Sequence, residues 1–259
     1  MRAVLFDMDG VLYNSEEAIP GAAETLAWLR ERQVPYLFVT NTASRGRDAL
    51  AGKLARFGIP ASPSEIMTPC EAAADWLRSQ AADKVALFLR PAARAAFEGL
   101  DCLPEDVESG ARYVVIGDLA SAWDFPTLNR AFRLLHGDPA ATLIALGMTR
   151  YWKAKDGISM DVAPFVAALE NASRRVALVF GKPAAAFFHA AAERLAVPCG
   201  EILMVGDDIE SDIAGAQSAG MQAALVRTGK FRSLDLEGPV KPDALLDSVA
   251  DLAEWWEQR

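Results

Sequence analysis

Two carboxylates stand two residues apart near the start of the sequence. Asp7 and Asp9 follow an apolar segment, and Gly10 comes next, where it lets the backbone turn sharply. An ordinary turn explains one Asp before Gly, but not a pair of carboxylates that leaves a buried strand. Paired acidic groups are what acid–base catalysis uses, so this pair is a candidate for such chemistry.

A second acidic group lies late in the chain, where Asp207, Asp208 and Asp212 crowd one turn. Carboxylates this close repel one another unless a cation or a lysine compensates their charge. Some acidic clusters are only helix caps. The second group is therefore a candidate cation site, with a helix cap as the alternative.

Two further motifs supply a hydroxyl, an amide and an ammonium group. Thr40 and Asn41 follow the apolar segment 36–39, and Lys182 follows the apolar segment 176–180. Taken alone, Thr40 and Asn41 are equally well explained as a helix N-cap, and Lys182 as a solvated residue at a helix start. Four polar motifs that each follow an apolar segment favour one shared site.

The elements that position these motifs follow from the alternation of short apolar runs with amphipathic stretches. This alternation is typical of α/β proteins with a mostly parallel sheet. Because ligands bind at the carboxyl ends of the strands in such sheets, the four motifs would converge there. The expected strands are 2–6, 36–39, 66–67, 85–89, 113–116, 142–146, 176–180, 202–205 and 223–226, and the expected helices are 20–31, 47–57, 70–78, 91–98, 126–136, 183–195, 212–219 and 247–258.

The opening pattern of the chain resumes after a different middle part. We therefore expect a core of residues 1–80 and 178–259, built on a Rossmann-like doubly wound parallel sheet. Residues 81–177 would form an inserted α/β domain. A length of 259 residues is consistent with one to two domains.

Composition limits the classes of partner. Lysine and arginine total 26 and aspartate and glutamate total 35, so the net charge is −9. Nucleic acid and anionic membranes are therefore not expected partners, and an anionic substrate needs a local cluster of cations. No apolar run is long enough to span a bilayer, the three cysteines lack metal-ligand spacing, and no signal peptide is present, which predicts a reduced, cytoplasmic protein.

The order of the motifs, Asp-x-Asp-Gly, Thr-Asn, Gly-Lys-Pro and Gly-Asp-Asp-x-x-x-Asp, resembles that of the haloacid dehalogenase-like (HAD) phosphatases. The resemblance is to the NagD-like branch, in which a class II cap domain is inserted after the second motif. It extends through residues 115–118, 128–132, 150–153, 155–157 and 227–230, and so covers nearly the whole chain.

The resemblance implies a Mg²⁺-dependent phosphohydrolase that acts on small phosphorylated metabolites. Asp7 would be the nucleophile that forms an aspartyl-phosphate. Asp9 would protonate the leaving oxygen and then activate water. Mg²⁺ would be bound by Asp7, the main-chain carbonyl of Asp9 and Asp207, an oxygen-only set that suits a hard cation.

Further roles are implied by the same resemblance. Thr40 and the amide of Asn41 would hydrogen-bond the transferring phosphoryl group, and Lys182 would neutralise its charge. We count Thr40 and Lys182 among the catalytic residues for this reason. Asp208 and Asp212 would orient water molecules and Lys182.

Two positions depart from the pattern of relatives. Asp9 stands where some relatives carry Ser, which favours hydrolysis of esters whose leaving group needs a proton. In the segment 158–165, Asp161 and Ala163 replace Gly-rich sequence, so no relative's substrate specificity is carried over. Dimerisation through the cap is common in this branch, so a homodimer is also implied.

Other reactions and roles are open at this stage. A phosphomutase or phosphotransferase would use the same intermediate. A receiver-type phospho-switch would be about half this length and would carry its acid pair and its phosphorylated Asp on different strands. A dehalogenase needs no metal cluster, and a pseudoenzyme would have lost at least one of Asp7, Asp9, Lys182 or Asp207.

Several basic residues have two possible roles. Arg45 and Arg47 follow the Thr-Asn motif, and Arg150, Lys153 and Lys155 lie in the inserted domain. Each group is either solvated or steers an anionic substrate. The sequence does not distinguish these roles.

Overall fold

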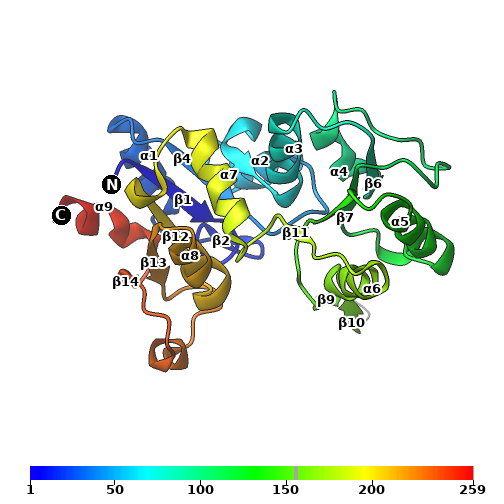
Figure 1. Ribbon diagram of the computed structural model, residues 1–259. Coiled ribbons are helices and arrows are strands. Elements are labelled where there is room, and N and C mark those ends of the chain that lie inside the picture. Colours follow the sequence, from blue (N-terminus) through cyan, green and yellow to red (C-terminus); the bar gives the residue numbers. More distant parts are fainter. Residues whose placement is uncertain (155–156, 259) are drawn as a thin grey trace. The chain divides into compact units, whose positions relative to one another are not determined.

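A computed structural model describes residues 1–154 and 157–258, which form two compact units (Figure 1). The first unit contains Met1–Thr40, Arg47–Met67 and Lys182–Arg259, and the second contains Asn41–Gly46 and Thr68–Gly181. The predicted fold class, an α/β core with an inserted α/β part, is confirmed. The predicted domain boundaries stay a prediction, since this division follows contacts and not independent folding.

A six-stranded parallel sheet forms the centre of the first unit. Its strand order is β14-β13-β12-β1-β4-β5. From β1 the chain adds β4 and β5 on one side, and it later adds β12, β13 and β14 on the other side, so the order of the strands reverses beside β1. Doubly wound sheets bind ligands at this reversal. The strands are β1 (Ala3–Asp7), β4 (Tyr36–Val39), β5 (Ile66–Met67), β12 (Ile202–Gly206), β13 (Gln222–Val226) and β14 (Ala244–Leu246).

Helices cover this sheet because its strands are apolar on both faces. Val4 and Phe6 of β1 pack in one core cluster with Leu26 and Leu29 of the first helix, and α7 packs against β4. The helices are α1 (Ala22–Glu31), α2 (Arg47–Arg56), α7 (Ala185–Leu195), α8 (Gly215–Ser218) and α9 (Leu252–Glu257), with short helical turns η1 (Pro63–Glu65), η4 (Cys199–Glu201), η5 (Ile209–Ala214), η6 (Ser233–Glu237) and η7 (Val249–Asp251) and a hairpin of β2 (Tyr13–Asn14) and β3 (Glu17–Ala18).

The second unit has its own parallel sheet, in the order β11-β8-β7-β6, and its own apolar core. The side chain of Asp124 begins the longest helix by accepting a hydrogen bond from the main-chain N–H of Thr127 at 2.8 Å. Its elements are α3 (Pro69–Ser79), β6 (Val85–Phe88), α4 (Pro91–Arg94), η2 (Ala95–Phe97), β7 (Tyr113–Ile116), η3 (Ala120–Ala122), α5 (Phe125–Gly137), β8 (Thr142–Ala145), the hairpin strands β9 (Tyr151–Ala154) and β10 (Gly157–Met160), α6 (Ala163–Ser173) and β11 (Leu178–Val179).

Four predicted elements differ from the structure. The expected helix 91–98 is divided into α4 and η2. The expected strand 176–180 is reduced to β11, because Val176 is 88% exposed and has no sheet partner among the described residues. The expected helix 212–219 is replaced by a π-helical turn, η5, that begins at Ile209, followed by the short α8. The last expected helix, 247–258, is divided into η7 and α9.

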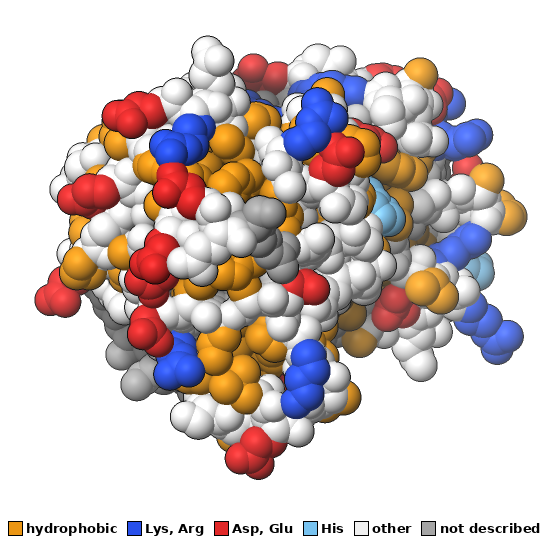
Figure 2. All heavy atoms as spheres, turned by 90° about the vertical axis from the view of Figure 1, so that its left-hand side faces the viewer, with side chains coloured by type: hydrophobic (Ala, Val, Ile, Leu, Met, Phe, Trp, Pro, Cys, Tyr) orange, Lys and Arg blue, Asp and Glu red, His pale blue; other side chains and the backbone are white. Residues whose placement is uncertain are grey.

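One face of the molecule shows how its charged side chains are distributed. On the face shown in Figure 2, basic and acidic side chains are interspersed and no large basic patch is visible among the described residues. No helix in the described ranges, 1–154 and 157–258, is both long and apolar enough to cross a membrane.

Candidate active site

Three neighbouring strands of the first unit bring polar side chains to one edge of the sheet. Asp7 ends β1, Thr40 follows the end of β4, and Asp207 follows the end of β12. Asp7 lies in register with Val39, one residue before Thr40. The predicted convergence of these motifs at the carboxyl ends of parallel strands is therefore what the topology produces.

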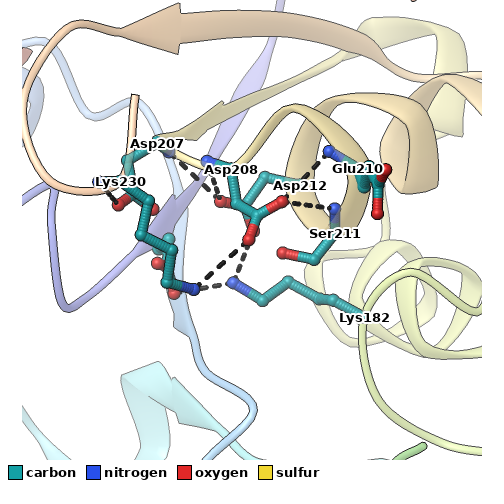
Figure 3. A network of polar contacts seen from close by, with 8 residues as sticks. Lys182, Asp207, Asp208, Glu210, Ser211, Asp212 and Lys230 are labelled. Carbon is teal, nitrogen blue, oxygen red and sulfur yellow. Dashed lines mark hydrogen bonds and ion pairs between the residues drawn. The ribbon is translucent and has the colours of Figure 1, made fainter. Parts of the chain in front are cut away.

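Lys182 lies between the carboxylates of Asp7 and Asp212, and Figure 3 shows its side chain pointing toward Asp212. Its ammonium group donates to Asp7 Oδ1 and to Asp212 Oδ1, each at 2.6 Å, and the lysine is only 5% exposed. Burial by itself would lower the pKa of Lys182, but the two carboxylates outweigh burial and raise it. Lys182 therefore stays charged and compensates part of the acidic cluster.

Asp212 uses both of its carboxylate oxygens within the protein. Oδ1 accepts the hydrogen bond from Lys182, and Oδ2 accepts from the main-chain N–H groups of Asp207 and Asp208 at 3.1 and 3.2 Å. Complete burial, with Asp7 nearby, raises the pKa of Asp212 to about 6 despite the contact with Lys182. Asp212 thus ties Lys182 to the loop that carries Asp207.

Asp208 caps the turn that follows β12. Its Oδ1 accepts from the main-chain N–H groups of Glu210 and Ser211, both at 3.0 Å, and its Oδ2 pairs with Lys230 Nζ at 3.3 Å (Figure 3). Burial favours a higher pKa for Asp208, but the Ser211 hydrogen bond and Lys230 outweigh burial and lower it. The helix-cap interpretation of this acidic motif therefore holds for Asp208.

Asp207 presents one oxygen without a partner. Its Oδ2 accepts the main-chain N–H of Lys230 at 2.7 Å, whereas its Oδ1 is buried and has no hydrogen-bond partner among the described residues. Burial, with Asp7 and Asp212 nearby, raises the pKa of Asp207 to about 7. A buried carboxylate oxygen of this kind costs free energy unless a cation binds it.

The donor set fits a hard divalent cation. Asp7, Asp207 and Asp212 are all buried, and one ligand oxygen from each lies within 4.8 Å of the others. Because both oxygens of Asp212 are already used, Asp7 and Asp207 are the carboxylates better placed to bind a metal ion. Carboxylate oxygens without thiols or imidazoles suit Mg²⁺.

Three other residues are predicted to belong to the site: Asp9, Thr40 and Asn41. The side chain of Asp9 is exposed, and its Oδ1 accepts the main-chain N–H of Ser15 at 3.3 Å. Thr40 is buried, and its main-chain N–H donates to Met67. Asn41 is the first residue of the second unit.

Glycines let the acidic loops approach each other. Gly10 has a φ of 94°, and a Cβ there would lie 2.1 Å from Asp207 Oδ2. Gly229 has a φ of 64°, and a Cβ at that position would also lie 2.1 Å from Asp207 Oδ2. The close contact explains the Gly after Asp9, but the role of the 227–230 loop was missed, because only its resemblance to relatives marks it in the sequence.

The basic residues singled out in the sequence lie in both units. Arg45 belongs to the second unit and Arg47 begins α2 in the first. Arg150 is exposed, and Lys153 lies in β9, where only its backbone is described. Lys155 lies outside the described residues. The main-chain N–H of Asp161 donates to the carbonyl of Arg150 at 3.0 Å. Asp161 is half-buried, and burial raises its pKa.

Family models match both parts of the chain that carry the motifs. A model of haloacid dehalogenase-like hydrolases matches residues 4–102, and a second HAD hydrolase-like model matches residues 179–252. Together with the parallel sheet and its carboxylate–lysine cluster, these matches define the class: the chain belongs to the haloacid dehalogenase-like hydrolases.

Individual relatives narrow this assignment. The chain is 36% identical to human phospholysine phosphohistidine inorganic pyrophosphate phosphatase, covering 98% of this chain and 93% of that protein. It is 38% identical to bovine haloacid dehalogenase-like hydrolase domain-containing protein 2, covering 93% and 90%. Within the family it is a phosphatase of the branch that holds NagD and the 4-nitrophenylphosphatases.

Solved structures support the same branch. NagD from Escherichia coli K-12 superposes with a TM-score of 0.86 at 25% identity, covering 97% of this chain and 98% of that one. The p-nitrophenyl phosphatase from Archaeoglobus fulgidus gives a TM-score of 0.87 at 26% identity, covering 98% of both chains.

Proposed function

We propose that this phosphatase hydrolyses small phosphorylated metabolites through an aspartyl-phosphate on Asp7 and depends on Mg²⁺. The observation that carries the proposal is the position of Asp7 at the end of β1. There Lys182 holds one of its oxygens at 2.6 Å, and the unpartnered oxygen of Asp207 lies in the same buried cluster. A phosphate ester is anionic, so a carboxylate can attack it only where cations compensate the negative charge. Lys182 supplies one cation, and a metal ion bound by Asp207 would supply another.

The first step is attack by a carboxylate oxygen of Asp7 on phosphorus. The bond from phosphorus to the leaving oxygen breaks, and Asp9 supplies the proton that this oxygen needs. The Asp9 side chain is exposed, and in the part of the chain that the structure describes its hydrogen-bond partner is the main-chain N–H of Ser15. A rotation toward the leaving group would therefore break no buried hydrogen bond.

In the second step, water attacks the phosphorus of the aspartyl-phosphate. Asp9, now ionised, removes the proton from this water, and inorganic phosphate leaves with Asp7 regenerated. Lys182 stays charged throughout and compensates the oxygens of the transferring group, while Thr40 and Asn41 donate hydrogen bonds to it. Mg²⁺, held by Asp7, Asp207 and the main-chain carbonyl of Asp9, would neutralise phosphoryl charge.

Turnover of 4-nitrophenyl phosphate and of a panel of phosphorylated metabolites tests this proposal. We expect release of phosphate with Mg²⁺, and loss of release with EDTA or in Asp7→Asn. Stable phosphorylation of Asp7 by a small phosphodonor without release of phosphate would favour the phosphotransferase or mutase alternative instead.

A further inference from the structure

The segment Thr228–Lys230 follows β13 and contacts both acidic motifs. Thr228 Oγ1 donates a hydrogen bond to the main-chain carbonyl of Gly10, and the main-chain N–H of Lys230 donates to Asp207 Oδ2 at 2.7 Å. Between them, a Cβ on Gly229 would lie 2.1 Å from Asp207 Oδ2 and 2.6 Å from Gly10 Cα. The segment therefore joins the Gly10 turn to Asp207.

Hydrogen bonds on both sides of Gly10 fix the direction of the Asp9 main-chain carbonyl. The N–H of Gly10 donates to the carbonyl of Tyr13 at 2.7 Å. In a trans peptide, the carbonyl of one residue points opposite to the N–H of the next, so this bond turns the Asp9 carbonyl away from Tyr13. Since Thr228 holds the carbonyl of Gly10 as well, neither peptide plane at Gly10 is free to rotate.

The same segment determines which oxygen of Asp207 is available. Lys230 occupies Oδ2 through its main chain, and Oδ1 is the buried oxygen without a partner. The segment Thr228–Lys230 thus leaves Asp207 Oδ1 as the available oxygen of Asp207, and through the Gly10 carbonyl it holds the peptide that follows the Asp9 carbonyl.

We propose that Thr228 is a positioning residue for the Mg²⁺ site. This inference rests on the proposed function, because it assigns Asp9 and Asp207 to the cation. The Thr228 hydroxyl contacts neither carboxylate and acts through the Gly10 turn. Removal of a group that hydrogen-bonds and orients a metal ligand, without binding the metal itself, lowers affinity for the metal about 10- to 100-fold.

Calorimetric titration of Mg²⁺ into the metal-free full-length protein tests the role of Thr228 without substrate. Thr228→Val keeps the side-chain shape and removes the hydroxyl, and we expect the Kd for Mg²⁺ to rise about tenfold. Thr228→Ser keeps the donor and should bind as the wild type does. Turnover by Thr228→Val should be reduced at limiting Mg²⁺ and should recover when Mg²⁺ is saturating.

Thr25→Val is the matched control. The hydroxyl of Thr25 donates to the main-chain carbonyl of Val249 at 3.1 Å, so it too joins two distant segments of the first unit. Neither segment carries a carboxylate of the site, and Thr25→Val should bind Mg²⁺ as the wild type does even if its melting temperature falls.

The outcomes separate the two proposals. Equal Kd values for wild type and Thr228→Val, or an equal loss in Thr25→Val, would overturn the role of Thr228 and leave the proposed function standing. No binding of Mg²⁺ by the wild type would contradict the proposed function itself. If circular dichroism shows that Thr228→Val is unfolded, Thr228→Ala gives the same comparison, and wild-type affinity in that variant would overturn the inference.

Discussion

At the scale of single residues, charge compensation decides what the acidic cluster can do. Lys182 is the cation that two buried carboxylates share. Replacement by Met would leave Asp7 and Asp212 without this charge. We expect Lys182→Met to lower kcat for 4-nitrophenyl phosphate at least about 100-fold, as measured by steady-state kinetics at saturating Mg²⁺.

Lys53→Met separates this effect from the general cost of removing a buried lysine. Lys53 is also buried, with its ammonium 4.0 Å from the centre of the Tyr13 ring and 3.9 Å from Glu16. It lies on α2 and has no contact with the carboxylate cluster among the described residues. Lys53→Met should lose stability but keep kcat, and an equal loss of kcat in both variants would contradict the assigned role of Lys182.

The raised pKa of Asp207 predicts a pH dependence of metal binding. With a pKa of about 7, Asp207 is mostly protonated at pH 6 and mostly ionised at pH 8. Since a metal ion binds the ionised form, affinity for Mg²⁺ should increase about tenfold from pH 6 to pH 8 in calorimetric titrations. Asp208, whose pKa is lowered, stays ionised over this range and adds nothing to the change. A Kd that does not change between pH 6 and pH 8 would contradict the combination of a raised pKa for Asp207 and metal binding by its ionised form.

The convergence of residues is the part of the site that sequence predicts best. Asp7, Thr40 and Asp207 each follow a strand of the six-stranded parallel sheet, which leaves them one place to meet. Lys182 follows β11, a strand of the other sheet, and its place beside Asp7 and Asp212 comes from their contacts rather than from this topology. Side-chain direction after a strand depends instead on the conformation of the turn. The hydrogen bonds that make Asp208 a cap therefore could not be derived from spacing alone.

At the scale of elements, helical structure after β12 begins earlier than the sequence pattern predicts. Apolar periodicity predicts a helix from residue 212, but helical structure begins at Ile209 because Asp208 supplies the cap. Buried strands such as β1 and β12 are predicted within a residue or two, since apolar runs bounded by polar residues fix them. The short β11 and the β9–β10 hairpin depend on contacts that no local pattern carries.

The cap at Asp208 predicts a stability effect. Asp208→Ala removes two hydrogen bonds to the start of η5 and should lower the free energy of unfolding by about 1 kcal/mol in urea titrations of the metal-free protein. Asp208→Ser keeps a capping oxygen and should recover most of this loss. Equal destabilisation in both variants would assign the effect to the Lys230 ion pair instead.

At the scale of the whole molecule, the residues of the carboxylate–lysine cluster all belong to one of the two units. The carboxylates and Lys182 all belong to the first unit, whereas Asp161 and Arg150 belong to the second. Substrate choice is a property that we expect of the inserted unit. This expectation explains why the motifs predict the reaction and not the substrate.

Resemblance to the branch predicts a homodimer formed through the inserted domain. Size-exclusion chromatography with light scattering at micromolar concentration should therefore give twice the mass of one chain. A monomer mass over that range would contradict this prediction without affecting the chemistry assigned to the first unit.

Every step of the proposed reaction passes through a covalent aspartyl-phosphate on Asp7. Acid-quenched single-turnover experiments detect this intermediate. Asp9→Asn should accumulate the intermediate, because the base that activates water is lost. After Asp9→Asn reacts with 4-nitrophenyl phosphate and Mg²⁺, mass spectrometry of the digested protein should find one phosphoryl group on the peptide that contains Asp7. The double variant with Asp7→Asn and Asp9→Asn should carry no phosphoryl group on this peptide. A phosphoryl group on another residue, or product release with no labelled peptide at any quench time, would contradict the account.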